Sequence, residues 1–138
     1  MFIATDKIRK QILPQPWLVG RQIEQTVVTV TDIDRSVAFY RDSIGLPFLF
    51  QFPGLAFFDC HGVRLMLTKP EGAQPASGNS VLYFKVDDIH QQAVELQSRG
   101  VKLEDTPHII ARLPDHELWM VFFRDPANNL LALMSEVR

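Results

Sequence analysis

The sequence has 138 residues, 46% of them hydrophobic, which is enough for one compact domain or for two half-size units that share a core. The formal net charge of −2 argues against nucleic acid and anionic membranes as partners, and no apolar run approaches the roughly 18–20 residues that span a bilayer. A single cysteine, Cys60, excludes an internal disulfide and agrees with a reducing compartment, so we expect a soluble, cytoplasmic protein.

Residues 1–22 are predicted to form an N-terminal arm. Apolar residues between Ile3 and Leu13 fit a short amphipathic helix, which Pro14 and Pro16 would end. Such a helix is too short and too weakly basic to anchor the chain to a membrane. We therefore expect the arm to pack on the domain or on a partner subunit.

Residues 23–69 are predicted to form a first βαβββ module. Its helix is indicated by an apolar stripe of Ile33, Val37, Tyr40 and Ile44, which recur at helical spacing. Residue pairs that favour turns separate the later strands of the module. The predicted strands cover residues 25–31, 48–52, 55–60 and 63–68.

Residues 70–79 are rich in proline, glycine, alanine and serine and are predicted to form a linker. Residues 80–138 are predicted to form a second βαβββ module, with its helix over residues 88–99. The longest irregular stretch, residues 105–117, has the length of a functional lid. The predicted strands of this module cover residues 81–86, 101–104, 118–124 and 130–134.

The two modules are an internal repeat. The sequence VTDI at residues 30–33 recurs as VDDI at residues 86–89, between an apolar strand and a helical pattern in both copies. Each predicted helix follows an aspartate that can accept the first backbone amides and precedes a glycine that suits a left-handed C-terminal residue. These residues are Asp32 and Gly45 in the first copy and Asp88 and Gly100 in the second.

Alternation along the strands predicts two kinds of sheet face. One phase is aliphatic and is expected beneath the helices. The opposite phase mixes apolar and polar side chains, which suits the lining of a small-molecule cavity but also suits a simple solvent-exposed face. The mixed phase contains Gln25, Val27, Thr29, Arg64, Met66, Tyr83 and Lys85.

Three segments, TDIDRSVAFYRDSIGLPF, VDDIHQQAVELQSRGV and FFRDPANNLLALM, resemble the paired module signatures of the vicinal oxygen chelate superfamily. This group includes glyoxalase I, methylmalonyl-CoA epimerase, extradiol dioxygenases, and the bleomycin- and fosfomycin-resistance proteins. The resemblance covers about residues 23–135. It implies an α+β fold in which two tandem βαβββ modules form a cup-shaped, partly open β-barrel with the helices outside.

The resemblance also implies where metal ligands would stand. Metal-dependent members hold a divalent ion with histidine or glutamine and glutamate from the first and last strand of each module. The corresponding positions here are Gln25, Met66, Val81 and Ala132. Only Gln25 fits, because methionine sulfur is too soft and the other two side chains have no donor atom. We therefore expect no metal and no other cofactor, with a divalent metal at a displaced site as the alternative.

The geometry of the family adds three residues to the expected ligand-binding face, and these are Met120, Phe122 and Ala132. Outside this pattern, His108, His116 and Glu117 cluster in the irregular stretch. Two histidines and a carboxylate could form a catalytic metal site, and the imidazole of His116 is a side chain that can act as an acid or a base. Their spacing matches no metal motif, so a surface loop is the alternative interpretation.

Two functions remain open, beside a third option, a structural subunit that binds no ligand. The first is a metal-free protein, like bleomycin-resistance proteins, that binds a small and anionic aromatic molecule in the cavity. The second is an enzyme of the lyase, isomerase or dioxygenase type, with an atypical site around Gln25, His108 and His116. In both cases the expected partners are a small molecule and a second copy of the chain, since modules of this superfamily often pair across subunits.

Overall fold

A computed structural model describes residues 23–70 and 80–138, so the predicted arm and nearly all of the predicted linker lie outside the described residues. The first module contains strand β1 (Gln25–Thr29), helix α2 (Ile33–Ala38), π-helix η1 (Phe39–Ile44) and strands β2 (Phe48–Phe52), β3 (Leu55–Cys60) and β4 (Val63–Thr68). The second contains β5 (Leu82–Lys85), α3 (Ile89–Ser98), β6 (His108–Arg112), β7 (Glu117–Arg124) and β8 (Leu130–Val137). In the described part of the chain, no helix is long and apolar enough to cross a membrane.

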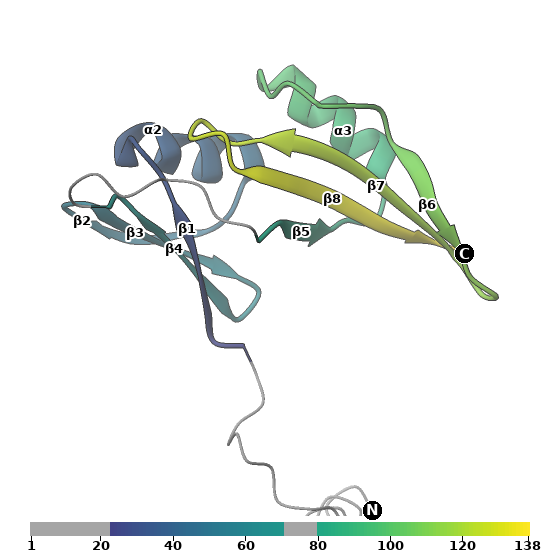
Figure 1. The fold of residues 1–138 in the computed structure, drawn as a ribbon, viewed down its shortest axis with the longest axis horizontal. Coiled ribbons are helices and arrows are strands. Elements are labelled where there is room, and N and C mark those ends of the chain that lie inside the picture. The colour runs from purple at the N-terminus through teal and green to yellow at the C-terminus, as the bar shows by residue number, and fades with distance from the viewer. Residues whose placement is uncertain (1–22, 71–79) are drawn as a thin grey trace, which may run out of the picture.

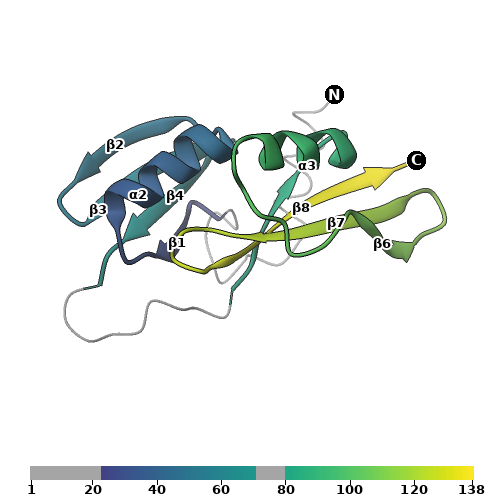
Figure 2. The same ribbon diagram turned by 90° about the horizontal axis from the view of Figure 1, so that it is seen from above.

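Each module forms its own four-stranded sheet. The strand orders are β1-β4-β3-β2 and β5-β8-β7-β6, so each module has the same topology, with its first strand parallel to its last. Figures 1 and 2 show each helix lying over the strands of its own module. The predicted α+β fold of two tandem βαβββ modules is thus confirmed, and the two sheets do not close into a barrel.

The helix boundaries follow the predicted capping residues. Asp32 and Asp88 have extended backbones, and their carboxylates accept the amides of Arg35 and Gln91 at 3.1 Å. Gly45 ends η1 with a φ of 89°, in the left-handed region that glycine tolerates best. The first helix changes to π-helical geometry at Phe39, which the apolar stripe did not indicate.

One hydrophobic core spans both modules. The aliphatic strand phases lie beneath the helices as predicted, and Val30, Leu65 and Leu67 of the first module are fully buried. Phe39 bridges the modules, since its ring lies 6.5 Å from that of Phe123 in β7. Trp119 packs on the same core from the helix side of β7.

The predicted strand over residues 101–104 is wrong. Leu103 forms only an isolated bridge with Phe123. Val101 instead stays at the end of α3, where it is buried and its amide donates to the carbonyl of Leu96 over 3.0 Å. The edge strand instead comes from the stretch predicted as irregular, where β6 pairs with β7. A tight turn closed by the amide of Leu113 and the carbonyl of His116, 2.8 Å apart, brings the two strands together.

Candidate functional site

The mixed phase of the first sheet forms one surface on the face turned away from the helices. β1 and β4 run parallel, with Gln25 beside Arg64 and Val27 beside Met66. The next strand, β3, adds Phe57 beside Met66. The residues between them along the strands, such as Val28 and Leu65, are buried on the helix side. We call Gln25, Val27, Phe57, Arg64 and Met66 the first-sheet surface.

Arg64 is the polar centre of this surface. Its Nε donates a hydrogen bond to Oε1 of Gln25 over 2.8 Å, and its guanidinium carbon lies 5.9 Å from the centroid of the Phe57 ring. The amide nitrogen of Gln25 lies 4.0 Å from the sulfur of Met66. None of the ion pairs formed within residues 23–70 and 80–138 includes Arg64. Gln25 therefore holds the guanidinium in place, and no carboxylate of the described residues forms an ion pair with it.

Aromatic rings extend the first-sheet surface toward its outer edge. Phe50 of β2 lies 4.7 Å from Phe57, centroid to centroid, and Phe52 lies 5.4 Å from Phe50. These residues were not predicted, since β3 carries phenylalanines in both phases and the pairing of β2 is irregular between Phe48 and Phe50. The signal that was available is that Phe57 shares its strand phase with the polar residue Asp59.

The second sheet has a corresponding surface. Ala132 of β8 lies between Tyr83 on one neighbouring strand and Phe122 on the other. The rings of Tyr83 and Phe122 meet edge to face, with 6.2 Å between their centroids. Ala132 is fully buried beneath them. Lys85 and Met120 both lie beside Met134, so they share this face. We call Tyr83, Lys85, Met120, Phe122 and Ala132 the second-sheet surface.

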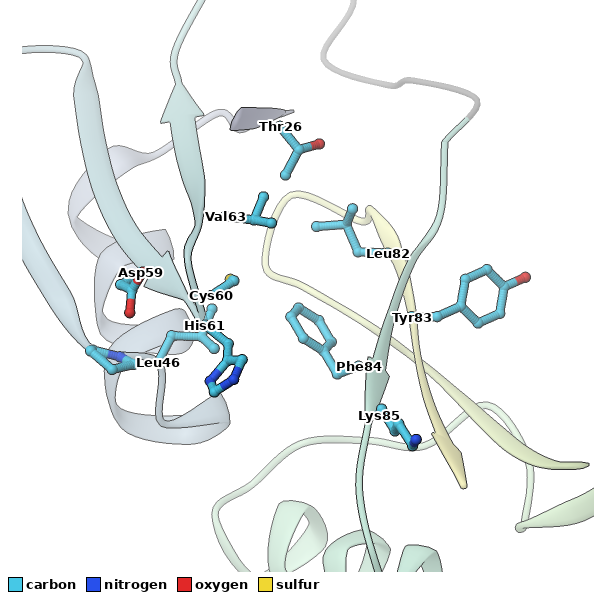
Figure 3. Close-up of a pocket in the computed structure, with 11 residues that line it drawn as sticks. Thr26, Leu46, Asp59, Cys60, His61, Val63, Leu82, Tyr83, Phe84 and Lys85 are labelled. Carbon is cyan, nitrogen blue, oxygen red and sulfur yellow. The ribbon is translucent and has the colours of Figure 1, made fainter. Parts of the chain in front are cut away.

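Within one chain, these two surfaces do not line a common cavity among the described residues. A cavity of about 650 Å³ lies between the modules, and we call it the junction cavity. Of the ten residues predicted to bind ligand, it contains only Tyr83 and Lys85. Val27 and Thr29 line a separate small cavity of about 110 Å³. Figure 3 shows Leu82 and Phe84 pointing into the junction cavity and Tyr83 pointing away from it.

The junction cavity is mostly apolar. The first module contributes Thr26, Leu46, Pro47, Val63 and residues 59–61, and the second contributes all four residues of β5. Cys60 lies in this wall, and its partial burial, followed by the nearby charge of Asp59, raises the pKa of its thiol. The thiol is thus held in its protonated, weakly nucleophilic form.

The residues at the family's metal-ligand positions do not fit a divalent ion. Val27 beside Met66 and Tyr83 beside Ala132 are matching pairs in the two modules, so the repeat places Met66 and Ala132 at equivalent points. The donor atoms at these four positions are one amide oxygen and one thioether sulfur. The amide oxygen is that of Gln25, and it already accepts a hydrogen bond from the guanidinium of Arg64. The positive charge of this guanidinium also repels a cation.

The histidine cluster is divided among separate contacts. Nδ1 of His108 lies 2.8 Å from the carbonyl of Thr106, and Nδ1 of His116 lies 2.8 Å from Oδ1 of Asp115. That hydrogen bond, and next the one from Arg138, lowers the pKa of Asp115. Glu117 accepts from the indole of Trp119 at 3.1 Å. Within the described ranges, no group of three or more histidine, cysteine, aspartate or glutamate residues is placed to hold a metal ion.

Comparisons with known proteins give a consistent assignment. The chain is 31% identical over 126 residues to an uncharacterized protein of Bacillus subtilis, YraH. The match covers 79% of this chain and 94% of that protein. A crystal structure of lactoylglutathione lyase from Agrobacterium tumefaciens is 27% identical, with a TM-score of 0.68, over 84% of this chain and 94% of that one.

A superfamily member from Sphaerobacter thermophilus shares the fold at 20% identity, with a TM-score of 0.69, over 86% of this chain and 100% of that one. The model of the Glyoxalase/Bleomycin resistance protein/Dioxygenase superfamily matches residues 22–133. The chain therefore belongs to the glyoxalase, bleomycin resistance protein and dioxygenase superfamily, which is the vicinal oxygen chelate group that its motifs indicate.

Proposed function

We propose that this protein binds a small, flat, anionic aromatic molecule without the help of a metal ion. The observation that carries the proposal is Arg64, whose guanidinium is fixed by Gln25 over 2.8 Å beside the Phe57 ring. A planar guanidinium binds a carboxylate or phosphate in two-pronged geometry, and an adjacent ring can stack on an aromatic ligand. On the first-sheet surface, Arg64 supplies the guanidinium and Phe57 supplies the ring beside it.

The charge on Arg64 favours an anion in particular. A hydrogen bond to a charged group contributes about 1.5–3 kcal/mol, which is larger than the typical contribution of a neutral one. Phe50 and Phe57 would contact the apolar body of the ligand, since they form a continuous pair on the same face. A neutral analogue of equal size keeps the aromatic contact and loses the charge-assisted bond.

The proposed active unit is a homodimer. Tyr83, Phe52 and Val27 lie on the helix-free faces of the sheets and are 46%, 55% and 49% exposed. Apolar groups exposed in this way mark surfaces that associate with a partner. In a symmetric dimer, the first-sheet surface of one subunit would face the second-sheet surface of the other. Lys85 and Tyr83 of the second subunit would then complete the cavity around the ligand held by Arg64.

The second candidate function is an enzyme of the same superfamily with an atypical site around Gln25, His108 and His116. The 27% identity to a lactoylglutathione lyase favours it. Against it stand the poor donor set at the metal-ligand positions and the hydrogen bond that engages Gln25. Metal analysis together with an assay for lactoylglutathione formation distinguishes this candidate from the metal-free binding protein.

A cytoplasmic location also belongs to the proposal, because the lone Cys60 carries a protonated thiol that a reducing compartment would preserve.

A thermal-shift screen with matched pairs of aromatic molecules tests the proposed function. Each pair consists of a carboxylate and its neutral amide or methyl ester on the same ring system. The proposal predicts that the carboxylates raise the melting temperature more than their neutral partners, by mass action on the folded state. Equal shifts within every pair would contradict it.

A further inference from the structure

The junction cavity leaves core residues partly uncovered. Leu82 and Phe84 belong to the strand phase that packs on the hydrophobic core, yet both also line the cavity and remain partly exposed. In the first module, the position equivalent to Phe84 is Val28 in β1, which is buried. Contact between these apolar side chains and water is unfavourable, so an apolar group that filled the cavity would stabilise the fold.

The chain enters the described fold beside this cavity. The amide of Arg64 donates to the carbonyl of Glu24 over 2.8 Å, so Glu24 lies beside the start of β4. The neighbouring residue, Val63, is part of the cavity wall, as is Thr26 two residues further along β1. The described part of the chain therefore begins near the edge of the cavity.

The segment that leads to this point has suitable side chains. Trp17, Leu18 and Val19 form an apolar cluster after Pro16. The segment lies outside the part of the chain that matches the superfamily, which begins at residue 22. Val19 and Gln25 are six positions apart, a reach of about 20 Å when the chain is extended.

We propose that Trp17, Leu18 and Val19 bind in the junction cavity of their own chain. The short tether gives the segment an effective concentration in the millimolar range, far above that of an untethered competitor. The apolar walls from both modules would cover the indole and leucine side chains. Thr26 lines the cavity, and its hydroxyl offers an acceptor for the indole N–H.

The reactivity of Cys60 provides a direct test, because this sole cysteine lines the cavity. The rate of labelling by N-ethylmaleimide is measured on the full chain and on Trp17→Ala. The proposal predicts that Trp17→Ala raises the rate about tenfold, as expected for the loss of one buried aromatic anchor. Leu13→Ala is the matched control, an apolar residue of the arm outside the segment, and is expected to leave the rate unchanged.

Trp17 fluorescence is the second measurement, made on the full chain carrying Trp119→Phe so that Trp17 is the only tryptophan. A blue-shifted emission relative to indole in water is expected. An emission like that of solvated indole, together with equal labelling of Trp17→Ala and the parent, would overturn the proposal.

Protection of Cys60 that disappears on dilution would assign the cavity to a second copy. Protection lost after unfolding, dialysis and refolding would assign it to a co-purified small molecule. Both results would overturn the proposal too.

Discussion

The phenolic hydroxyl of Tyr40 donates a hydrogen bond to Oδ2 of Asp125 over 2.8 Å, between residues 85 positions apart in the chain. Tyr40 is fully buried in the first module, whereas Asp125 begins the β7–β8 turn of the second. Asp125 also accepts the backbone amides of Ala127 and Asn129, and Asn129 donates to the carbonyl of Thr29 in β1. This network connects the two modules and therefore contributes to how the first-sheet and second-sheet surfaces are placed.

Removing the hydroxyl is expected to destabilise the junction. Tyr40→Phe keeps the ring contacts but leaves one oxygen of a buried carboxylate with one donor fewer. We predict a loss of about 1.5–3 kcal/mol in the free energy of unfolding, measured by urea denaturation. Tyr83→Phe, which changes an exposed tyrosine, is the matched control and is expected to have no effect. A loss below about 0.5 kcal/mol for Tyr40→Phe would show that the network does not hold the modules together.

The same tyrosine predicts a dependence of stability on alkaline pH. Burial, and next the charge of Asp125, raises the pKa of Tyr40 far above its ordinary value. The unfolded chain therefore loses this proton near pH 10 while the folded chain keeps it. Stability is fully present below about pH 10 and falls by about 1.4 kcal/mol per pH unit above it.

Urea denaturation between pH 9 and pH 11 checks this slope. The Cys60 thiol, whose pKa is raised by burial, acts in the same direction, so the comparison is made in a Cys60→Ala background. Tyr40→Phe is expected to flatten the slope, while Tyr83→Phe keeps it. An unchanged slope in Tyr40→Phe would assign the effect to other groups.

Association is predicted to use the faces of the sheets. The protein is expected to be a dimer at micromolar concentration, as measured by light scattering. Phe52→Lys is predicted to weaken the dimer at least tenfold, because it places a charge among exposed aromatic rings. Val94→Lys on the outer side of α3 changes an equally exposed apolar residue and is expected to leave the dimer intact. A monomeric parent protein, or equal effects of both substitutions, would contradict this arrangement.

Metal content separates the two candidate functions. Protein purified without chelators is predicted to carry no stoichiometric zinc, nickel, manganese or iron and to form no lactoylglutathione. The reason is that Met66, Val81 and Ala132 stand where the superfamily places ligands. One tightly held divalent ion per chain, lost on replacing His108 or His116 with alanine, would favour the enzyme with a displaced site.

Much of the fold could be predicted from local signals. Asp32 and Asp88 begin the helices and Gly45 ends one, because capping depends only on neighbouring residues. The edge strand of the second module could not be located in this way. Residues 101–104 and 108–112 are both plausible strands alone, and pairing with β7 decides between them.

The candidate site was predictable only in part. Alternation correctly indicates that Gln25 and Arg64 share a face, since the side-chain period is local. It does not identify Phe57 and Phe50, because β3 is aromatic in both phases and the pairing of β2 is irregular between Phe48 and Phe50. Nor does it indicate that, of the residues predicted to bind ligand, the junction cavity contains only Tyr83 and Lys85. How the two modules pack depends on contacts between distant segments, such as the one between Tyr40 and Asp125.

The most direct measurement is the affinity of Arg64→Ala for the aromatic carboxylate that binds most tightly in the screen, determined by calorimetry beside its neutral amide. The account predicts that the substitution weakens carboxylate binding about 10- to 100-fold and leaves amide binding unchanged. Arg35→Ala, an exposed arginine on α2, is the control and is expected to change neither affinity. Equal losses for carboxylate and amide, or a preference for the carboxylate that survives the loss of both Arg64 and Lys85, would contradict the account.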